Sequence, residues 1–412
     1  MRSLPQPGSH VQCRIHGVTL EGTFVTSRDG KAVIKLDSGY NIGVDPSSLG
    51  AGIAPPPVEL QVTRIEQNSH LPECTIISTG GTIASRIDYR TGAVTSQFSA
   101  DDILRAIPGL GTIARYRTHQ ISSILSENMH VGIWIDLARA IYREIADGVQ
   151  GIIVTHGTDT MAFTASAVSF MVESPVPIIF VGSQRSADRP SSDNVMNAVC
   201  SAQAAVSPLG EVAVVMHAST SDDRCAIHRA TRVRKMHTSR RNAFQSIGMH
   251  PLGYIEYPSL SLTLSSDAIR RGNREPHLTD QLEKKVALIS FTPGMPQSIL
   301  PHYSDYRGLV VAGTGLGHVS SGWVPAIREL VEGGTTVVMT SQCLHGRVCD
   351  RVYDTGRDLL AAGIIEGEDM LPETALVKLA WVLGQERGPE QIRVLMQENL
   401  RGEIQRRSLH GL

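Results

Sequence analysis

The chain has 412 residues, of which 41% are hydrophobic and 19% are charged. This length exceeds that of one ordinary hydrophobic core and predicts two or three domains. The formal net charge of -2 excludes an overall electrostatic attraction to nucleic acid or to an anionic membrane. No apolar run approaches the roughly eighteen residues of a membrane span, and the N-terminus lacks the apolar segment of a signal peptide. We therefore expect a soluble, cytoplasmic protein without membrane contact.

The six cysteines form no Cys-x-x-Cys pair and have no nearby histidine at a spacing typical of zinc sites. This pattern is typical of reduced, structural thiols. We expect no metal site in the chain.

The N-terminal part, from about residue 10 to residue 50, alternates apolar and polar positions over short spans. Turn-forming residues interrupt this alternation at Arg28-Asp29-Gly30 and at Asp37-Ser38-Gly39. The pattern predicts a small β-barrel or sandwich of four or five strands. Ala54-Pro55-Pro56-Pro57 ends this domain, because consecutive prolines favour an extended linker.

From about residue 72, short apolar strands alternate with helical stretches, a pattern that predicts parallel sheets covered by helices on both faces. The fold class is therefore α/β, with two parallel-sheet domains preceded by the small β-domain. The predicted divisions are 1–55 for the β-domain, 56–71 for the linker, 72–270 for the first α/β domain, 271–285 for a charged connection and 286–412 for a smaller second α/β domain.

Two strand ends carry hydroxyl groups. After the apolar residues 75–77, Gly80-Gly81 permits a tight turn that leaves Thr82 exposed. The apolar strand 151–155 is followed by His156-Gly157-Thr158-Asp159-Thr160 and then by a predicted helix. Ligands of parallel α/β sheets bind outside the carboxyl ends of the strands, so both segments are predicted to face one substrate.

Threonine is the candidate nucleophile for amide hydrolysis, since the chain has no Gly-x-Ser-x-Gly elbow and no recognisable glutaminase cysteine motif. A threonine hydroxyl needs an activating base. Lysines are scarce, which makes Lys235 the candidate base. Three simpler interpretations remain open at this point: a commonplace Gly-Gly-Thr turn, a helix N-cap at 156–160, and a solvated or RNA-contacting basic face at 229–241.

The segments 79–83 and 156–160 together are similar to the paired signatures of the bacterial-type L-asparaginase and glutaminase family. Longer strings narrow this resemblance to the D-subunit family of archaeal-type glutamyl-tRNA(Gln) amidotransferases. The asparaginase-like resemblance covers about 72–407, and an N-terminal β-domain is the extension expected of members of that family. The segments that resemble the D-subunit family are 182–193, 229–239, 341–348 and 367–374.

This resemblance implies roles for individual residues. Thr82 and Thr158 are jointly assigned as nucleophile candidates, and Asp159 would orient the Lys235 that draws the proton from Thr158. Tyr89 falls on the segment that matches the family's mobile lid and would assist Thr82. The resemblance also implies a loop that holds the two ends of the substrate: Ser126 would donate to the α-carboxylate and Glu127 would accept from the α-ammonium. The loop 313–318 matches only loosely the segment that a neighbouring subunit contributes in this family, and we leave it outside the catalytic set.

The resemblance further implies that the chain hydrolyses L-glutamine and supplies ammonia to a tRNA-amidating kinase partner of the E type. That partner would bind ATP and Mg²⁺ and most of the Glu-tRNA(Gln), while this chain would hold no cofactor and form a homodimer within a heterotetramer. Two alternatives are a free-standing L-asparaginase and a binding module without activity. The added β-domain argues against the first alternative, and the complete set of candidate residues argues against the second.

Overall fold

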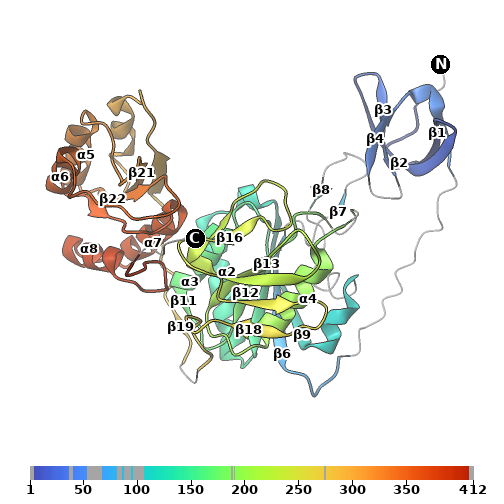
Figure 1. Cartoon of the computed structure of the whole chain (residues 1–412), viewed down its shortest axis with the longest axis horizontal. Helices are drawn as coiled ribbons and strands as arrows, with labels where there is room; N and C mark the ends of the chain where they lie inside the picture. Colours follow the sequence, from blue (N-terminus) through green and yellow to red (C-terminus); the bar gives the residue numbers. More distant parts are fainter. Residues whose placement is uncertain are drawn as a thin grey trace.

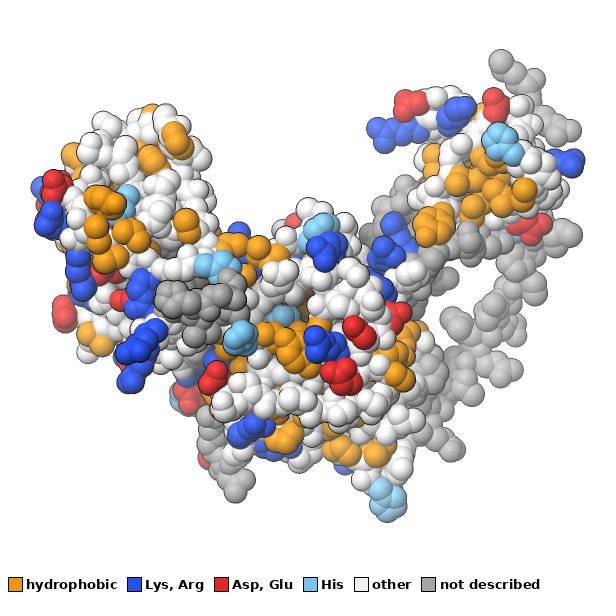
Figure 2. Space-filling model, viewed as in Figure 1, with side chains coloured by type: hydrophobic (Ala, Val, Ile, Leu, Met, Phe, Trp, Pro, Cys, Tyr) orange, Lys and Arg blue, Asp and Glu red, His pale blue; other side chains and the backbone are white. Residues whose placement is uncertain are grey.

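The fold was established from a computed structural model, which describes residues 4–36, 40–52, 67–80, 86–87, 94–95, 106–186, 189, 191–272 and 275–407 (Figure 1). Among these residues, no helix combines the length and apolar character needed to cross a bilayer. Figure 2 shows acidic and basic side chains interspersed on the visible face, in line with the small net charge.

The N-terminal domain is an antiparallel sheet with the strand order β4-β3-β2-β1-β5. Its alternating residues bury one apolar face, which includes Val11, Phe24 and Ile34. The predicted turn at residues 28–30 joins β2 to β3, and its Asp29 and Gly30 both have positive φ. The second predicted turn, at 37–39, lies outside the described residues. The elements are β1 (His10–Ile15), β2 (Val18–Arg28), β3 (Lys31–Leu36), β4 (Asn41–Val44), η1 (Pro46–Ser48) and β5 (Leu49–Ala51).

The central domain contains an eight-stranded sheet in the order β18-β17-β14-β13-β12-β10-β6-β9. The five strands from β13 to β9 are parallel, as predicted. Three further strands, β14, β17 and β18, extend the sheet in antiparallel fashion, which the alternation of strands and helices did not predict. The strands are β6 (Glu73–Gly80), β9 (Arg115–Ile124), β10 (Gly151–Thr155), β12 (Ile178–Val181), β13 (Val212–His217), β14 (Arg224–Arg229), β17 (Gly253–Glu256) and β18 (Leu262–Leu264).

Helices cover both faces of this sheet. α2 and α3 pack on one face with residues such as Val154 and Phe180, and α4 packs on the other with Ile153 and Ile179. The helical elements are η3 (Pro108–Thr112), η4 (Ser126–Asn128), α2 (Val131–Ala146), α3 (Met161–Met171), α4 (Asn194–Ala205) and η5 (Ala230–Arg232).

Three short strand pairs complete the central part. The pair β15 (Val233–Lys235) and β16 (Phe244–Ser246) forms a hairpin, and β7 (Arg86–Ile87) pairs with β8 (Val94–Thr95). The charged segment 271–285 is not a bare connection, because its strand β19 (His277–Leu278) pairs antiparallel with β11 (Val172–Glu173).

The second α/β domain has a fully parallel sheet in the order β20-β21-β22-β23. Helix α7 packs against this sheet and also against α3, so one apolar core is continuous between the two α/β domains (Figure 1). The elements are β20 (Val286–Ser290), η6 (Gln297–Tyr303), β21 (Gly308–Gly313), α5 (Trp323–Glu332), β22 (Thr336–Ser341), α6 (Asp354–Ala361), β23 (Ile365–Glu366), α7 (Pro372–Leu383) and α8 (Pro389–Gln397).

Candidate active site

The carboxyl ends of β6, β10 and β12 lie side by side. Thr155 of β10 is in register with Ser78 of β6 and with Val181 of β12. The Thr79 hydroxyl donates to the carbonyl oxygen of Thr155 at 2.9 Å, which fixes the end of β6 against β10. The carboxyl ends of these strands therefore lie at one edge of the sheet, where ligands of parallel α/β sheets bind. The residues that follow β6, from 81 to 85, lie outside the described residues.

The junction between β10 and α3 carries Thr158 and Asp159. Its close fit depends on two glycines. A Cβ atom on Gly157 would lie 2.6 Å from the Cβ of Ser126, and one on Gly182 would lie 2.7 Å from the His156 carbonyl oxygen. Both distances are too short for real carbon contacts, so these glycines allow three segments to approach Thr158. Sequence reasoning had not singled out either glycine for this packing role, although each stands beside a polar strand end.

Lys235 reaches this junction from the last position of β15. Its Nζ donates to Thr158 Oγ1 at 2.8 Å and to Asp159 Oδ1 at 2.7 Å. Thr158 is buried, and the Lys235 side chain is 14% exposed, whereas the Asp159 side chain is 69% exposed. An amine within hydrogen-bond distance of a hydroxyl has the geometry for proton transfer, and the carboxylate orients that amine. The three side chains that the sequence predicted to cooperate are therefore in direct contact.

The helix N-cap interpretation of 156–160 does not account for this geometry. Thr160 is the N-cap residue of α3, and it makes no side-chain capping bond. Its hydroxyl donates instead to the carbonyl oxygen of Ser126 at 2.8 Å. This bond joins the junction to η4, where Ser126 is buried and Glu127 is exposed. The proposed substrate-holding loop thus lies against the segment that carries Thr158.

Thr82 and Tyr89 lie outside the described residues, so their predicted roles stay predictions. His156 is fully buried, and this burial lowers its pKa to about 4. Its Nδ1 lies 2.7 Å from the Gly157 carbonyl oxygen. A ring that stays neutral near pH 7 and faces a backbone carbonyl fits a hydrogen-bonding role for His156 rather than that of a base.

The basic run 229–241 is largely paired with carboxylates. Arg229 Nε lies 2.7 Å from Glu211, and Arg232 NH2 lies 2.5 Å from Asp369. Both arginines are buried. These contacts contradict the solvated-face interpretation for the start of the run and support a structural role beside Lys235.

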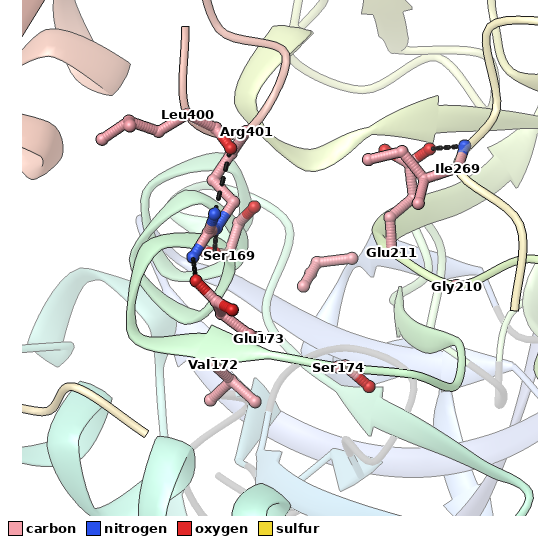
Figure 3. A pocket seen from close by; sticks show the side chains of 10 residues that line it. Ser169, Val172, Glu173, Ser174, Gly210, Glu211, Ile269, Leu400 and Arg401 are labelled. Atoms are coloured by element: carbon pink, nitrogen blue, oxygen red, sulfur yellow. Dashed lines mark hydrogen bonds and ion pairs between the residues drawn. The ribbon is translucent and has the colours of Figure 1, made fainter. Parts of the chain in front are cut away.

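The C-terminal segment 400–405 fastens the backbone just before Lys235. Thr231 Oγ1 donates to the Arg401 carbonyl oxygen at 3.0 Å, and Arg232 Nε donates to that of Gly402 at 3.4 Å. Arg401 itself pairs with Glu173 of β11, just after α3 (Figure 3). The carbonyl oxygens of Arg401 and Gly402 therefore help to position the β15–β16 hairpin.

A cavity of about 110 Å³ lies beside this segment and is lined in part by Leu400 and Arg401 (Figure 3). Neither Thr158 nor Lys235 lines it. Its charged groups already have partners: Glu173 with Arg401, and Glu211 with Arg229. Within the described parts of the chain, no three His, Cys, Asp or Glu side chains gather as a metal site would require.

Comparison with known proteins places these residues in a family. The asparaginase N-terminal domain model matches residues 73–267, the glutaminase/asparaginase C-terminal domain model matches 285–396, and the GatD N-terminal domain model matches 6–51. A solved structure, that of the thermostable L-asparaginase from Thermococcus kodakarensis, is 34% identical, with a TM-score of 0.72, over 81% of this chain and 99% of that one.

Curated relatives match along nearly their whole length. The D subunit of the glutamyl-tRNA(Gln) amidotransferase of Methanosarcina barkeri is 52% identical over 96% of this chain and 97% of the relative. The protein of the same name from Archaeoglobus fulgidus is 52% identical over 97% of this chain and 95% of the relative. The chain belongs to the family of glutamyl-tRNA(Gln) amidotransferase D subunits, within the wider asparaginase and glutaminase family.

Proposed function

We propose that this chain is the glutaminase subunit of a tRNA-dependent amidotransferase. It hydrolyses L-glutamine to glutamate and passes the ammonia to a partner that converts Glu-tRNA(Gln) to Gln-tRNA(Gln) with ATP. The observation that carries this proposal is the contact of Lys235 Nζ with both Thr158 Oγ1 and Asp159 Oδ1. The names of the curated relatives and the match to the GatD N-terminal domain support the tRNA-dependent context.

The chemistry follows from that contact. A threonine oxygen attacks the side-chain amide carbon of glutamine, and the C–N bond breaks as the nitrogen leaves, protonated, as ammonia. Lys235, in its neutral form, accepts the hydroxyl proton of Thr158 and returns it to the departing nitrogen. Water then hydrolyses the γ-glutamyl ester to glutamate. Thr82 and Thr158 remain joint candidates for the ester, with Tyr89 assisting Thr82.

The substrate ends are assigned to the η4 loop. Ser126 donates to the α-carboxylate and Glu127 accepts from the α-ammonium, since glutamine carries both charges on one carbon. The partner is a tRNA-amidating kinase of the E type, which holds ATP, Mg²⁺ and most of the Glu-tRNA(Gln). This chain forms a homodimer within a heterotetramer with that partner and works in the cytoplasm.

A free-standing L-asparaginase is the second candidate, because solved L-asparaginases share the fold of the two α/β domains. Those chains align over about four-fifths of this one, which leaves the antiparallel domain at 6–51 as the distinguishing feature. A non-enzymatic module is the third, and a glutamine-derived acyl adduct on a threonine would rule it out.

The deciding experiment measures ammonia release from glutamine and from asparagine, with and without the partner subunit and Glu-tRNA(Gln). We expect slow basal turnover that rises on glutamine only in the full mixture. Rapid asparagine hydrolysis that ignores both additions would identify a free-standing asparaginase. Thr158→Val should abolish the coupled amidation, and intact amidation by that variant would overturn the site assignment.

A further inference from the structure

The hairpin that ends β15 places Lys235 at the base of an eight-residue turn, 236–243, and most bonds of this turn are internal. The Met236 N–H donates to the Ala243 carbonyl oxygen at 2.7 Å. Two other backbone N–H groups of the turn donate to the His237 ring, and Arg240 bonds to Asn242. Such bonds shape the turn without fixing it to the sheet.

Ala243 at the end of the turn is buried in the apolar core, and Arg241 makes side-chain hydrogen bonds outside the turn. Its guanidinium donates to Asp222 Oδ1 at 2.5 Å and to the carbonyl oxygen of Thr220. Both acceptors belong to the loop 218–223 between β13 and β14. The Arg241 side chain is 15% exposed, whereas the Asp222 side chain is 62% exposed. Asp222 thus connects the turn after Lys235 to the sheet.

Asp222 has a second partner, the buried ring of His217 at the end of β13, whose Nε2 lies 3.2 Å from Oδ1. The other ring nitrogen, Nδ1, lies 2.6 Å from Asn197 Oδ1. The amide nitrogen of Asn197 donates to Asp193 and to the Gly182 carbonyl oxygen. Because this orientation leaves Asn197 Oδ1 as an acceptor, His217 Nδ1 carries a proton.

This chain of hydrogen bonds ends beside the nucleophile candidate. The space at the Gly182 α-carbon is so limited that a Cβ there would lie 2.9 Å from Thr158 Cγ2. One end of this series of hydrogen bonds therefore lies against Thr158, and the other end bonds to the turn that follows Lys235. The members, in order, are Gly182, Asn197, His217, Asp222 and Arg241.

The proton on His217 Nδ1 makes the contact with Asp222 depend on pH. Nε2 donates to the carboxylate only when the ring carries a second proton. Burial lowers the pKa of His217, the nearby carboxylates Asp222 and Asp193 oppose that shift, and Arg241 adds to it. The neighbouring Cys225 thiol stays neutral, because burial raises its pKa well above the usual value. Above the His217 pKa, Arg241 alone holds Asp222.

We propose that Asp222, held between Arg241 and His217, is a positioning residue that keeps Lys235 within proton-transfer distance of Thr158. This inference rests on the proposed function. A misplacement of about 1 Å at a catalytic group costs on the order of 10²-fold in rate. Lys235 acts on the Thr158 hydroxyl and not on the two ends of the substrate. Loss of the hydrogen bond between Arg241 and Asp222 should therefore lower kcat and leave KM nearly unchanged.

The test compares Asp222→Ala with Asp222→Asn, using steady-state glutamine hydrolysis by the complete amidotransferase. Asp222→Ala should lower kcat by about 10- to 100-fold. In Asp222→Asn the amide oxygen can replace Oδ1 and accept from Arg241, so this variant should keep at least about half of kcat.

Asp223→Ala is the matched control, because Asp223 lies in the same loop and bonds to Ser219 and to the Arg224 N–H instead of to the hairpin. Its kcat should be unchanged. Unchanged kcat in Asp222→Ala, or an equal loss in Asp222→Asn, would overturn the proposal.

Hydrogen exchange of the amides at 236–243 gives a readout that needs no activity. Exchange should accelerate in Asp222→Ala and stay slow in Asp222→Asn. If the unaltered protein released no ammonia from glutamine, the proposed function would fail. Hydrogen exchange would still test whether Asp222 holds the turn. Equal hydrogen exchange in all variants would show that Asp222 does not hold the turn 236–243.

Discussion

Lys235 Nζ lies 2.8 Å from Thr158 Oγ1, although 77 residues separate the two in the chain. Thr158 stands where β10 passes into α3, and Lys235 ends the first strand of a hairpin beyond the parallel part of the sheet. Neither element positions the pair alone. The contact exists because α3, η5 and the C-terminal domain share one core.

We predict that Lys235→Met abolishes most glutamine hydrolysis. The substitution keeps the length of the side chain and removes the proton acceptor, so kcat should fall by about 10²- to 10⁴-fold. Lys235→Arg should lower kcat by a similar factor, because a guanidinium does not deprotonate in a protein. Steady-state kinetics measure both.

The matched control is Lys285→Met, since Lys285 pairs with Asp305 on the surface of the C-terminal domain. It should leave kcat unaltered. A Lys235→Met variant that retained full activity would remove this lysine from the mechanism.

Gly157→Ala should raise the KM for glutamine. The added methyl group would lie 2.6 Å from Ser126 Cβ, so the η4 loop that holds the substrate ends must shift. Gly111→Ala is the control, because a Cβ at Gly111 meets nothing within 4 Å. Both variants should unfold cooperatively; an unchanged KM in Gly157→Ala would argue against η4 as the substrate loop.

Asp350 should make stability fall as pH rises. Its side chain is fully buried, neither carboxylate oxygen has a hydrogen-bond partner among the residues that the structure describes, and His318 Nε2 is 4.0 Å away. Burial, with a contribution from the charge of Glu366, raises its pKa to about 7 from an ordinary 3.8. The folded state therefore holds a proton that the unfolded state releases between these values. This contribution is complete below about pH 4 and is lost as pH rises through about 7.

Asp350→Asn should remove that loss. At about pH 8 the variant should be the more stable protein, by at most on the order of 4 kcal/mol, and near pH 4 the difference should vanish. Thermal unfolding across this range measures it. Asp354→Asn, at an exposed position, serves as control. Equal pH dependence in Asp350→Asn and the unaltered protein would count against a protonated Asp350.

Removing one partner of the buried ion pair of Lys378 with Glu403 should lower the stability of the protein. Both side chains are fully buried, and Nζ lies 2.6 Å from Oε1. Lys378→Met leaves the carboxylate without its cation, and stability should fall by about 3–5 kcal/mol. Lys378→Met combined with Glu403→Gln should recover part of this loss in urea unfolding. Equal stability of the single and double variants would show that the uncompensated charge is not the cause.

The sequence predicted those parts of the fold that follow from local pattern. The alternation of apolar and polar residues predicted the N-terminal strands, and short apolar runs predicted parallel strands such as β10 and β12. The hairpin strands and β19 escaped prediction because they have two or three residues and gain their stability from tertiary pairing. The antiparallel strands β14, β17 and β18 escaped because strand direction has no local signal.

The candidate site was predictable only in part. The resemblance to a known family identified Thr158, Asp159 and Lys235, and their mutual contact follows from the fold. The buried bond between His217 and Asn197 was not predictable, since their separation of twenty residues follows no motif. Such a bond forms where two elements happen to bury polar groups against each other.

The contact of the segment 400–405 with η5 has a consequence for how distant changes reach the site. The carbonyl oxygens of Arg401 and Gly402 accept from Thr231 and Arg232, three to four residues before Lys235. A change that loosens this segment should therefore weaken the support of the catalytic lysine without touching any residue of the site.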